Sequence, residues 1–237
     1  MKYVICESCA RQVRDFARGY LDPDPHADPT KGFEYAVHSL YLDSPSLTLC
    51  RATMMGHKNR FKLRIRFYDD SPDSPAFLEV KRRVNDAVRK QRVAVRKSCI
   101  QRVLAGHWPG RPDVIDYGLR SHLAIQAFCN LRTMIQAQGQ VVVSYMREAY
   151  VSPHSNHVRV TFDRRLHGVA YGGDGTLRRD GVRAVPKMDG VILEVKFTNR
   201  FPEWLSQMAQ CTNIVRCSCA KYVKCMAALR APQMQLH

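Results

Sequence analysis

Residues 59–68 read NRFKLRIRFY, and in this stretch basic and apolar side chains alternate strictly. The basic residues are Arg60, Lys62, Arg64 and Arg66, and the apolar ones are Phe61, Leu63, Ile65 and Phe67. A period of two is that of a β-strand, so the four cations leave one face and the four apolar side chains leave the other. The stretch therefore predicts a half-buried strand whose second face is a row of positive charge.

Seven further segments have strand-like patterns, and five have helical ones. The strands are expected at 2–5, 35–43, 59–69, 76–83, 88–95, 140–151, 157–163 and 190–197, and the helices at 8–21, 98–106, 119–137, 202–210 and 218–229. Residues 22–32 hold three prolines and predict a surface loop, and the glycine-rich residues 168–182 predict a long hairpin connection. We expect an α+β fold with about eight mostly antiparallel strands that close into a barrel, and one domain over residues 1–237 with its core at 2–229.

The other strands also place their ionisable residues on one face. The groups that share a face are Glu79 with Lys81, Lys90 with Arg92, Tyr145 with Arg147, Arg159 with Thr161 and Asp163, and Glu194 with Lys196. An ordinary solvated face is the alternative interpretation, but such a face mixes signs and carries more uncharged polar residues. Same-face cations about 6.6 Å apart repel by about 2.5 kcal/mol at an effective dielectric constant near 20. If the sheet closes with these faces inward, the pattern predicts a cationic tunnel that needs an anion.

A chain of phosphates suits such a tunnel, because arginine forks and lysine ammonium groups both bind phosphate oxygens. Carboxylates within that positive field are explained best as ligands of a divalent metal that bridges phosphate oxygens. We expect Glu194 to be the metal ligand, with Glu79 and Asp163 as helpers. The alternative for Glu194 is an ion pair with Lys196 or with an arginine of a neighbouring strand.

The composition favours an anionic partner. Lys and Arg number 37 against 21 Asp and Glu, which gives a formal charge of +16. Nucleic acid, a phosphate polymer and an acidic membrane surface all fit that surplus. An RNA-binding sheet has only this charge in its favour, because the aromatic residues of the 59–68 stretch lie on the face opposite the cations, away from where bases would stack. No apolar run reaches the ~18 residues of a membrane span, so any membrane attachment is expected to go through a partner protein.

The nine cysteines are scattered, and no segment resembles a secretory signal, which indicates a cytoplasmic protein with free thiols. Cys6 and Cys9 have the spacing of half a zinc knuckle. The later cysteines do not supply a second half with the usual spacing; they are Cys211, Cys217, Cys219 and Cys225. We therefore expect these cysteines to be small buried hydrophobic residues.

Several motifs together resemble the VTC domain, the polyphosphate polymerase domain of the vacuolar transporter chaperone complex, which belongs to the triphosphate tunnel metalloenzymes. In order, they are YAVHSLYLDSP, RFKLRIRFY, FLEVKRR, RKQRVAV, VRVTFD, LEVKF followed by P-x-W-L, and AKY. The resemblance runs from about Lys2 to Leu229. It implies an eight-stranded antiparallel tunnel that binds ATP or a triphosphate with Mn²⁺ or Mg²⁺ and transfers the γ-phosphate to a polyphosphate chain.

The resemblance also implies a role for each matching residue. The catalytic residues would be Arg64, Arg66, Lys81, Lys90, Arg147 and Lys221. The substrate-binding residues would be Lys2, Arg60, Lys62, Arg92, Tyr145, Arg159 and Lys196, with Arg60 at the tunnel mouth and Lys62 as a supporting wall residue. Glu194 would hold the metal. The partners would be ATP and inorganic polyphosphate, with a membrane protein as a further one.

Three alternatives remain open from the sequence. The same tunnel could serve a tripolyphosphatase or nucleoside triphosphatase that uses water as the acceptor, a polyphosphate-binding module without catalysis, or the RNA-binding sheet considered above. The family opens with a fuller first strand than Met1-Lys2-Tyr3 provides, so we expect either a start site upstream or a shortened first strand.

Overall fold

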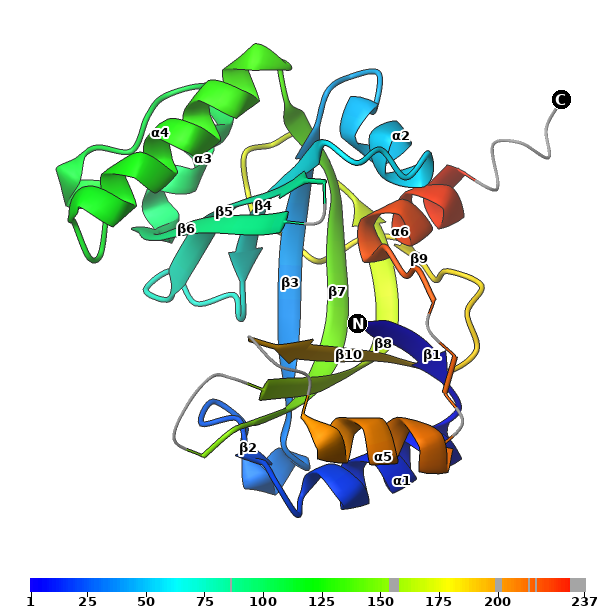
Figure 1. Cartoon of the computed structure of the whole chain (residues 1–237). Coiled ribbons are helices and arrows are strands. Elements are labelled where there is room, and N and C mark those ends of the chain that lie inside the picture. Colours follow the sequence, from blue (N-terminus) through cyan, green and yellow to red (C-terminus); the bar gives the residue numbers. More distant parts are fainter. Residues whose placement is uncertain (86, 154–157, 199–201, 213, 216, 231–237) are drawn as a thin grey trace, which may run out of the picture. The chain divides into compact units, whose positions relative to one another are not determined.

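The computed structural model describes residues 1–85, 87–153, 158–198, 202–212, 214–215 and 217–230 (Figure 1). The strands are β1 (Lys2–Ile5), β2 (Asp22–Pro23), β3 (Glu34–Asp43), β4 (Arg60–Phe67), β5 (Pro75–Val84), β6 (Ala87–Arg96), β7 (Gln138–Val151), β8 (Val158–Ala170), β9 (Arg183–Ala184) and β10 (Val191–Phe197). The α-helices are α1 (Glu7–Ala17), α2 (Thr48–Met54), α3 (Ile100–Ala105), α4 (Leu119–Met134), α5 (Glu203–Thr212) and α6 (Lys221–Arg230). Short 3₁₀ turns lie at Pro29–Lys31, Lys97–Cys99 and Arg111–Asp113.

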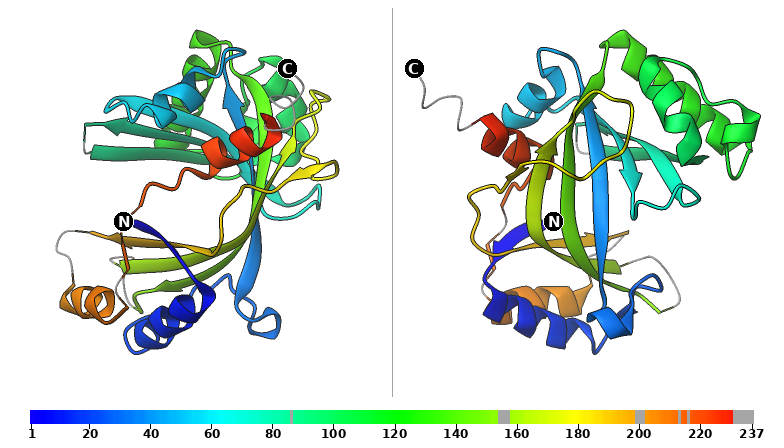
Figure 2. Two further views of the ribbon diagram at one scale, coloured as in Figure 1. Left: turned by 90° about the vertical axis from the view of Figure 1, so that its right-hand side faces the viewer. Right: turned by 180° about the vertical axis from the view of Figure 1, so that it is seen from behind.

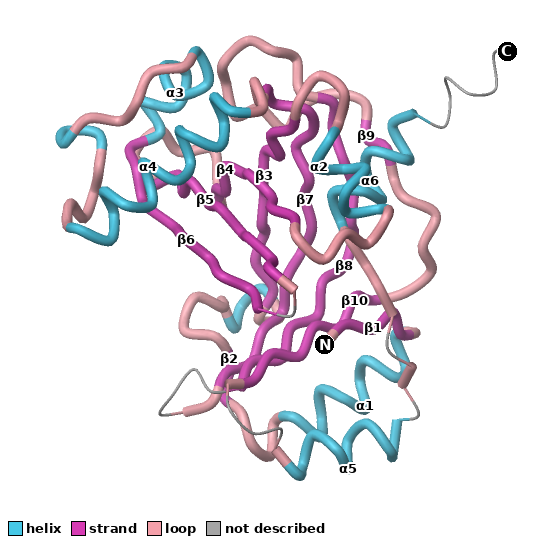
Figure 3. Tube along the Cα trace, turned by 45° about the horizontal axis from the view of Figure 1, so that its top comes forward, coloured by secondary structure: helices cyan, strands magenta, loops and turns pink. Residues whose placement is uncertain are grey.

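Antiparallel pairing dominates the sheet, as predicted for an α+β fold. Eight strands follow one another in the order β1-β10-β8-β7-β3-β4-β5-β6, while β2 pairs with β7 and β9 with β8 (Figure 3). The predicted eight strands are therefore present, together with two short ones. In the described residues no ladder joins β6 to β1, so the hydrogen bonding does not close into the expected ring. A short strand such as β1 and a charged one such as β6 are typical of sheet edges.

Two segments differ from the sequence prediction. Helix α2 was not expected, because its seven residues carry little helical periodicity. Its amino end is fixed by Asp43, whose carboxylate accepts the backbone N–H groups of Leu49 and Cys50 at 2.9 and 2.8 Å. Strand β8 continues to Ala170, past the start of the predicted connection at residue 168.

Residue contacts divide the chain into two compact units. The first comprises Met1–Ala36, Tyr145–Leu166 and Lys187–Cys219, and the second comprises Val37–Ser144, His167–Pro186 and the chain from Ala220 onward. Each unit is built from three chain segments, because β3, β7 and β8 contribute residues to both. The single domain inferred from the sequence stays a prediction.

Each unit has its own apolar core. In the second unit the predicted apolar face of β4 is buried, with Leu63, Ile65 and Phe67 each 0% exposed. The same core includes Phe128 of α4, the helix that packs on β5 and β6. In the first unit β1, β8 and β10 turn their apolar faces toward α1 and α5, as Phe162 illustrates. Figure 2 shows these two helices side by side on that face. The predicted alternation of buried and ionisable faces is confirmed in both units.

The cysteines follow their prediction only in part. Among the eight cysteines whose side chains the structure describes, five are buried, namely Cys50, Cys99, Cys129, Cys219 and Cys225, while Cys9 and Cys217 are partly exposed. The side chain of Cys211 lies outside the described ones. Cys6 is exposed, which corrects the expectation of a buried residue, because it stands just before α1 rather than on the helix's packed face. In the described residues no helix is both long and apolar enough to cross a membrane.

Candidate functional site

Strand register gathers the predicted cations of the second unit into rows. In β4, β5 and β6, Arg64 stands opposite Glu79, which stands opposite Arg92. The next row consists of three lysines, Lys62, Lys81 and Lys90. Glu79 is therefore flanked by an arginine on each of the two strands that pair with β5. The neighbouring row across the same strands contains only lysines.

Glu79 is the centre of this group, which we call the Glu79 cluster: Arg64, Arg66, Glu79, Lys90 and Arg92. The side chain of Glu79 is 1% exposed. Arg64 Nε donates to its Oε2 at 2.6 Å, and Lys90 Nζ lies 2.8 Å from Oε1. Arg92 Nε is 3.5 Å from Oε1 and Arg66 Nε is 3.9 Å from Oε2. Burial alone would raise the pKa of Glu79, but the charges of Arg64, Arg66 and Lys90 outweigh it and hold that pKa well below its usual range.

The cluster holds more positive charge than one carboxylate can balance. Burial and the neighbouring arginines lower the pKa of Lys90 against the pull of Glu79. The Nε of Arg66 is buried and makes no hydrogen bond to any residue that the structure describes, and the same holds for Oγ of Ser39, which pairs with Arg66 in register. Buried donors without partners are costly, so this place is suited to an anion that would accept from them.

A tyrosine that the sequence prediction missed borders the same cluster. Arg64 Nη1 donates to the hydroxyl of Tyr41 at 3.2 Å, and the Tyr41 ring stacks on Tyr222 with centroids 4.8 Å apart. The hydroxyl of Tyr222 donates in turn to Asp43 at 2.8 Å. Burial would raise the pKa of Tyr41, but Arg64 and Lys62 lower it to about 8. The signal was present in the parity of strand 35–43, which places Tyr41 on the face opposite Leu40 and Leu42.

Lys221, predicted to act from the last helix, is the first residue of α6 and is buried. Next to it is Tyr222, which stacks on Tyr41 as described above. Arg60 lies at the start of β4, partly exposed, and donates to the carbonyl of His57. Its role as a residue of the tunnel mouth stays a prediction.

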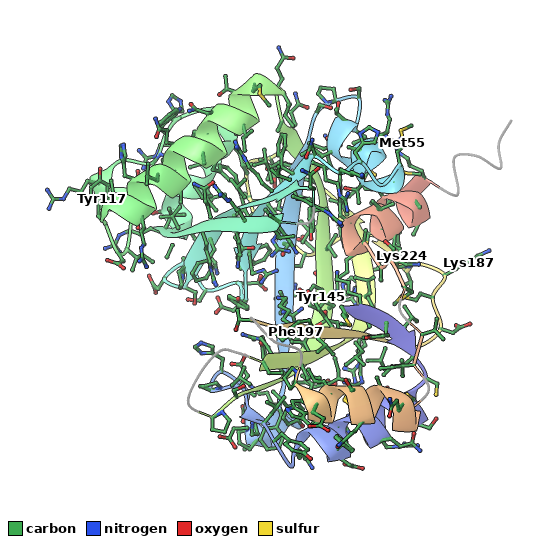
Figure 4. All side chains as sticks on the ribbon, in the orientation of Figure 1. Met55, Tyr117, Tyr145, Lys187, Phe197 and Lys224 are labelled. Carbon is green, nitrogen blue, oxygen red and sulfur yellow. The ribbon has the colours of Figure 1, made fainter. Side chains whose placement is uncertain are left out.

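In the first unit the central arginine has an acidic partner of its own. Arg147 Nε and Nη2 donate to the two carboxylate oxygens of Asp163 at 2.7 and 2.9 Å, and both residues are buried. The guanidinium also lies over the ring of Tyr145, 5.2 Å from its centroid; Figure 4 marks Tyr145 on β7. Burial acts to lower the pKa of Arg147, but Tyr145 and Asp163 raise it well above its usual value. Asp163 therefore serves the arginine with both oxygens.

Arg159 is held in a similar way. Its Nη2 contacts the carboxylate of Asp24 and donates to the hydroxyl of Tyr35 at 3.2 Å. Asp24 is 4% exposed and also accepts the backbone N–H of His26 at 3.0 Å. The sequence prediction missed Asp24, because it lies in a proline-rich segment with no strand pattern.

The proposed metal ligand lies in the middle of a polar row. Glu194 pairs with Lys2 on one side and Thr161 on the other, and Lys196 Nζ is 3.6 Å from its Oε1. Thr161 Oγ1 is buried without a hydrogen-bond partner in the described part of the chain. Lys2 Nζ donates to the carbonyl of Cys219 at 3.1 Å. The ion pair with Lys196 that the sequence analysis offered as an alternative is thus present.

The donor set decides which kind of metal site is possible. In the described ranges no three His, Cys, Asp or Glu side chains gather as a metal cage. Glu194 can serve Mn²⁺ or Mg²⁺ in a different way, because Mg²⁺ is commonly bound by one or two carboxylates with substrate phosphates and water as the other ligands. The residues fit a metal that arrives with a phosphate chain.

The predicted site residues thus fall into two groups. The second unit brings together Arg60, Lys62, Arg64, Arg66, Lys81, Lys90 and Arg92 on adjacent strands, with Lys221 on α6. The first unit holds Lys2, Tyr145, Arg147, Arg159, Glu194 and Lys196. Whether both groups face one ligand stays a prediction.

Comparisons with known proteins found one family and similar solved structures. The family model of the VTC domain matches residues 1–230. Among solved structures, a candidate adenylate cyclase from Bacillus halodurans superposes with a TM-score of 0.52 and 12% identity, over 93% of this chain and 91% of that one. The PH1819 protein from Pyrococcus horikoshii OT3 gives a TM-score of 0.47 and 11% identity, over 97% of both chains. No curated protein matches the sequence.

Proposed function

Because the chain belongs to the VTC domain family, we propose that it is a metal-dependent polyphosphate polymerase that transfers the γ-phosphate of ATP to a polyphosphate chain. The observation that carries this proposal is the excess of cations around the buried carboxylate of Glu79, with the buried Arg66 Nε lacking a hydrogen-bond partner in the described residues. A polyanion supplies the missing acceptors, and a chain of phosphates supplies them at regular spacing.

The residues divide the work by their chemistry. Arg64, Arg66 and Arg92 present guanidinium groups that bind phosphate oxygens in pairs, while Lys90 adds a point charge. Phosphoryl transfer needs positioning and charge neutralisation more than a nucleophilic side chain, since the attacking group is the terminal phosphate of the polymer and is already an anion. These cations would offset the repulsion between two polyanions and stabilise the leaving diphosphate.

Glu194 would hold Mn²⁺ or Mg²⁺ together with phosphate oxygens of the nucleotide. When bound, the metal would neutralise charge on the transferring phosphate. In the first unit Arg147, Arg159 and Lys196 would contact the phosphate chain while keeping the acidic partners that orient them. ATP and polyphosphate are thus the proposed partners.

The test is to incubate the purified chain with ATP and Mn²⁺ and to separate the products. We expect ADP and long polyphosphate, and a strong reduction of both in the Arg64→Ala variant. Release of orthophosphate alone would identify a tripolyphosphatase or nucleoside triphosphatase instead. Tight polyphosphate binding with no turnover of ATP would identify a binding module. Arg82→Ala is the matched control, because Arg82 follows Lys81 on β5, is exposed, and leaves the strand on the face opposite Lys81.

A further inference from the structure

Cys6 and Cys9 lie at the amino end of α1, in the first unit. Cys6 directly precedes the helix, with extended backbone angles, and Cys9 is the third residue of the helix. The side chain of a residue in this preceding position faces the backbone of the second or third helical residue, which brings Cys6 near Cys9. Cys6 is exposed and Cys9 is partly exposed, so small oxidants can reach this pair. We propose that Cys6 and Cys9 form a reversible redox site, in which Cys6 is the attacking thiol and Cys9 closes a disulfide.

The two thiols differ in the way that such a mechanism needs. Cys6 Sγ lies 3.0 Å from the hydroxyl of Ser8, a contact that stabilises a thiolate. The Ser8 hydroxyl and the backbone N–H of Cys9 lower the pKa of Cys6. Burial raises the pKa of Cys9, and the charge of Cys6 raises it further. The thiol of Cys6 is therefore the better nucleophile. The thiol of Cys9 stays protonated until it attacks the Cys6 sulfur.

The reaction balances with a small disulfide such as oxidised glutathione as the oxidant. The Cys6 thiolate attacks one glutathione sulfur, breaks the S–S bond and releases one glutathione thiolate. Cys9 then loses its proton and attacks the Cys6 sulfur, forming the Cys6–Cys9 bond and releasing the second glutathione thiolate. Two electrons pass from the protein to the oxidant, and the two protons end on the released glutathione.

The site lies at a tightly packed junction. Cys6 directly follows β1, and a Cβ at Gly190 would lie 2.3 Å from the carbonyl oxygen of Ile5. β1 pairs with β10, and this pairing places Lys2 opposite Glu194. A disulfide between Cys6 and Cys9 would therefore form at the end of a strand that is already held by its pairing with β10. The backbone N–H of Cys217 also donates to the carbonyl of Lys2 at 2.9 Å, so the junction has little room to adjust.

Trypsin makes the proposal easy to test. Cleavage after Lys2 and Arg11 releases the peptide YVICESCAR, which contains Cys6 and Cys9 and no other cysteine. The folded protein is equilibrated in glutathione buffers of increasing oxidised fraction, quenched with acid, alkylated and digested. We expect mass spectrometry to find this peptide two hydrogens lighter and unalkylated, and we expect reduced glutathione to reverse the change.

Variants separate the proposed order of events from general thiol oxidation. Cys9→Ser should stop at a glutathione adduct on Cys6, Cys6→Ser should leave Cys9 largely unreacted, and Ser8→Ala should slow the adduct several-fold. Cys217→Ser is the matched control and should behave as the unaltered chain. The proposal is overturned if the peptide stays reduced while other cysteines oxidise, if Cys9 reacts as fast as Cys6, or if the peptide is joined to CSCAK, the peptide of Cys217 and Cys219.

Discussion

In the second unit, four cations from two neighbouring strands lie around the carboxylate of Glu79, whereas in the first unit Arg147 donates to both carboxylate oxygens of Asp163. The same contrast holds further out. Arg159 is held by Asp24, and Lys196 lies beside Glu194. The two units therefore pair the same residue types in different ratios: several cations share one carboxylate in the second unit, whereas each of these cations has its own acidic partner in the first.

This difference between the two units indicates which cations can bind an added anion most strongly. An arginine that already has a bidentate carboxylate gains little from a phosphate, because the new contact only adds to a satisfied one. A cation that shares its carboxylate with other cations, or that lacks a hydrogen-bond acceptor, gains more from a contact with phosphate. We infer that the Glu79 cluster binds the phosphates. We also infer that the first unit supplies a fixed polar surface, on which the carboxylate of Glu194 is suited to bind a metal.

The largest expected effect is on stability, from Arg147→Ala. This change removes the guanidinium that donates to both oxygens of the buried Asp163, and breaking a buried ion pair in this way costs about 3–5 kcal/mol. Denaturant titration followed by circular dichroism measures the free energy of unfolding. Arg66→Ala is the counterpart in the second unit and should change that free energy much less, because its removal relieves repulsion. Equal losses in the two variants would remove the contrast between the units.

The double variant Arg147→Met with Asp163→Leu sharpens the same test. Replacing both members of a buried pair by apolar residues is often neutral, so most of the stability lost in Arg147→Ala should return. If it does not, Arg147 stabilises the fold through contacts other than Asp163.

The next effect is on catalysis, from Arg64→Ala in the second unit. Removal of one preorganised group that stabilises charge typically costs about 10²–10³-fold in rate. We expect a loss of this order in polyphosphate formation, with the free energy of unfolding nearly unchanged. Both are measured on the same preparation, beside the Arg82→Ala control. A loss of stability as large as that of Arg147→Ala would show that Arg64 has a structural role instead.

Glu194→Gln tests the proposed metal site of the first unit. We expect Mn²⁺-stimulated product formation to fall about tenfold or more, since even indirect changes at metal sites cost about 10–100-fold. Tripolyphosphate binding without metal, measured by calorimetry, should change little, because Glu194 is not part of the Glu79 cluster. Glu203→Gln on α5 is the matched control, at an exposed position. If metal-free binding falls as much as activity, Glu194 positions Lys196 rather than a metal.

The pH dependence of stability follows from Glu79. Its folded-state pKa lies well below the ordinary value of 4.5, so it contributes stability that is present above that value and is lost as the pH falls below it. In that acidic range the unfolded chain takes up a proton that the folded chain does not. Glu79→Gln should therefore flatten the curve of unfolding free energy against pH below 4.5 by up to about 1.4 kcal/mol per pH unit. Parallel curves for the two proteins would contradict the contacts that surround Glu79.

Much of this arrangement could be predicted from single strands. The parity of residues 59–68 gives the buried face of β4, and the same rule works for β5, β6, β8 and β10, because each has one face on a core. The sequence could not give partners across strands, since register is a tertiary property. For that reason the contacts of Glu79 with four cations were not predicted, and Asp24 was not considered at all; the expected role of Glu79 beside a metal stays a prediction.

The smallest expected effect belongs to Tyr41, the site residue that parity could have found. Its pKa is lowered to about 8, so between pH 7 and 9 it ionises and places a negative charge against Arg64. That charge competes with phosphate, and tripolyphosphate affinity should fall over this range by about threefold more than it does in Tyr41→Phe. By linkage, bound phosphate disfavours the tyrosinate, so adding tripolyphosphate at pH 8 should reduce tyrosinate absorbance in the ultraviolet. Tyr117→Phe, at an exposed tyrosine, should retain both effects. If Tyr41→Phe retains them as well, Tyr41 lies outside the field of the bound phosphate, and the Glu79 cluster ends at Arg64.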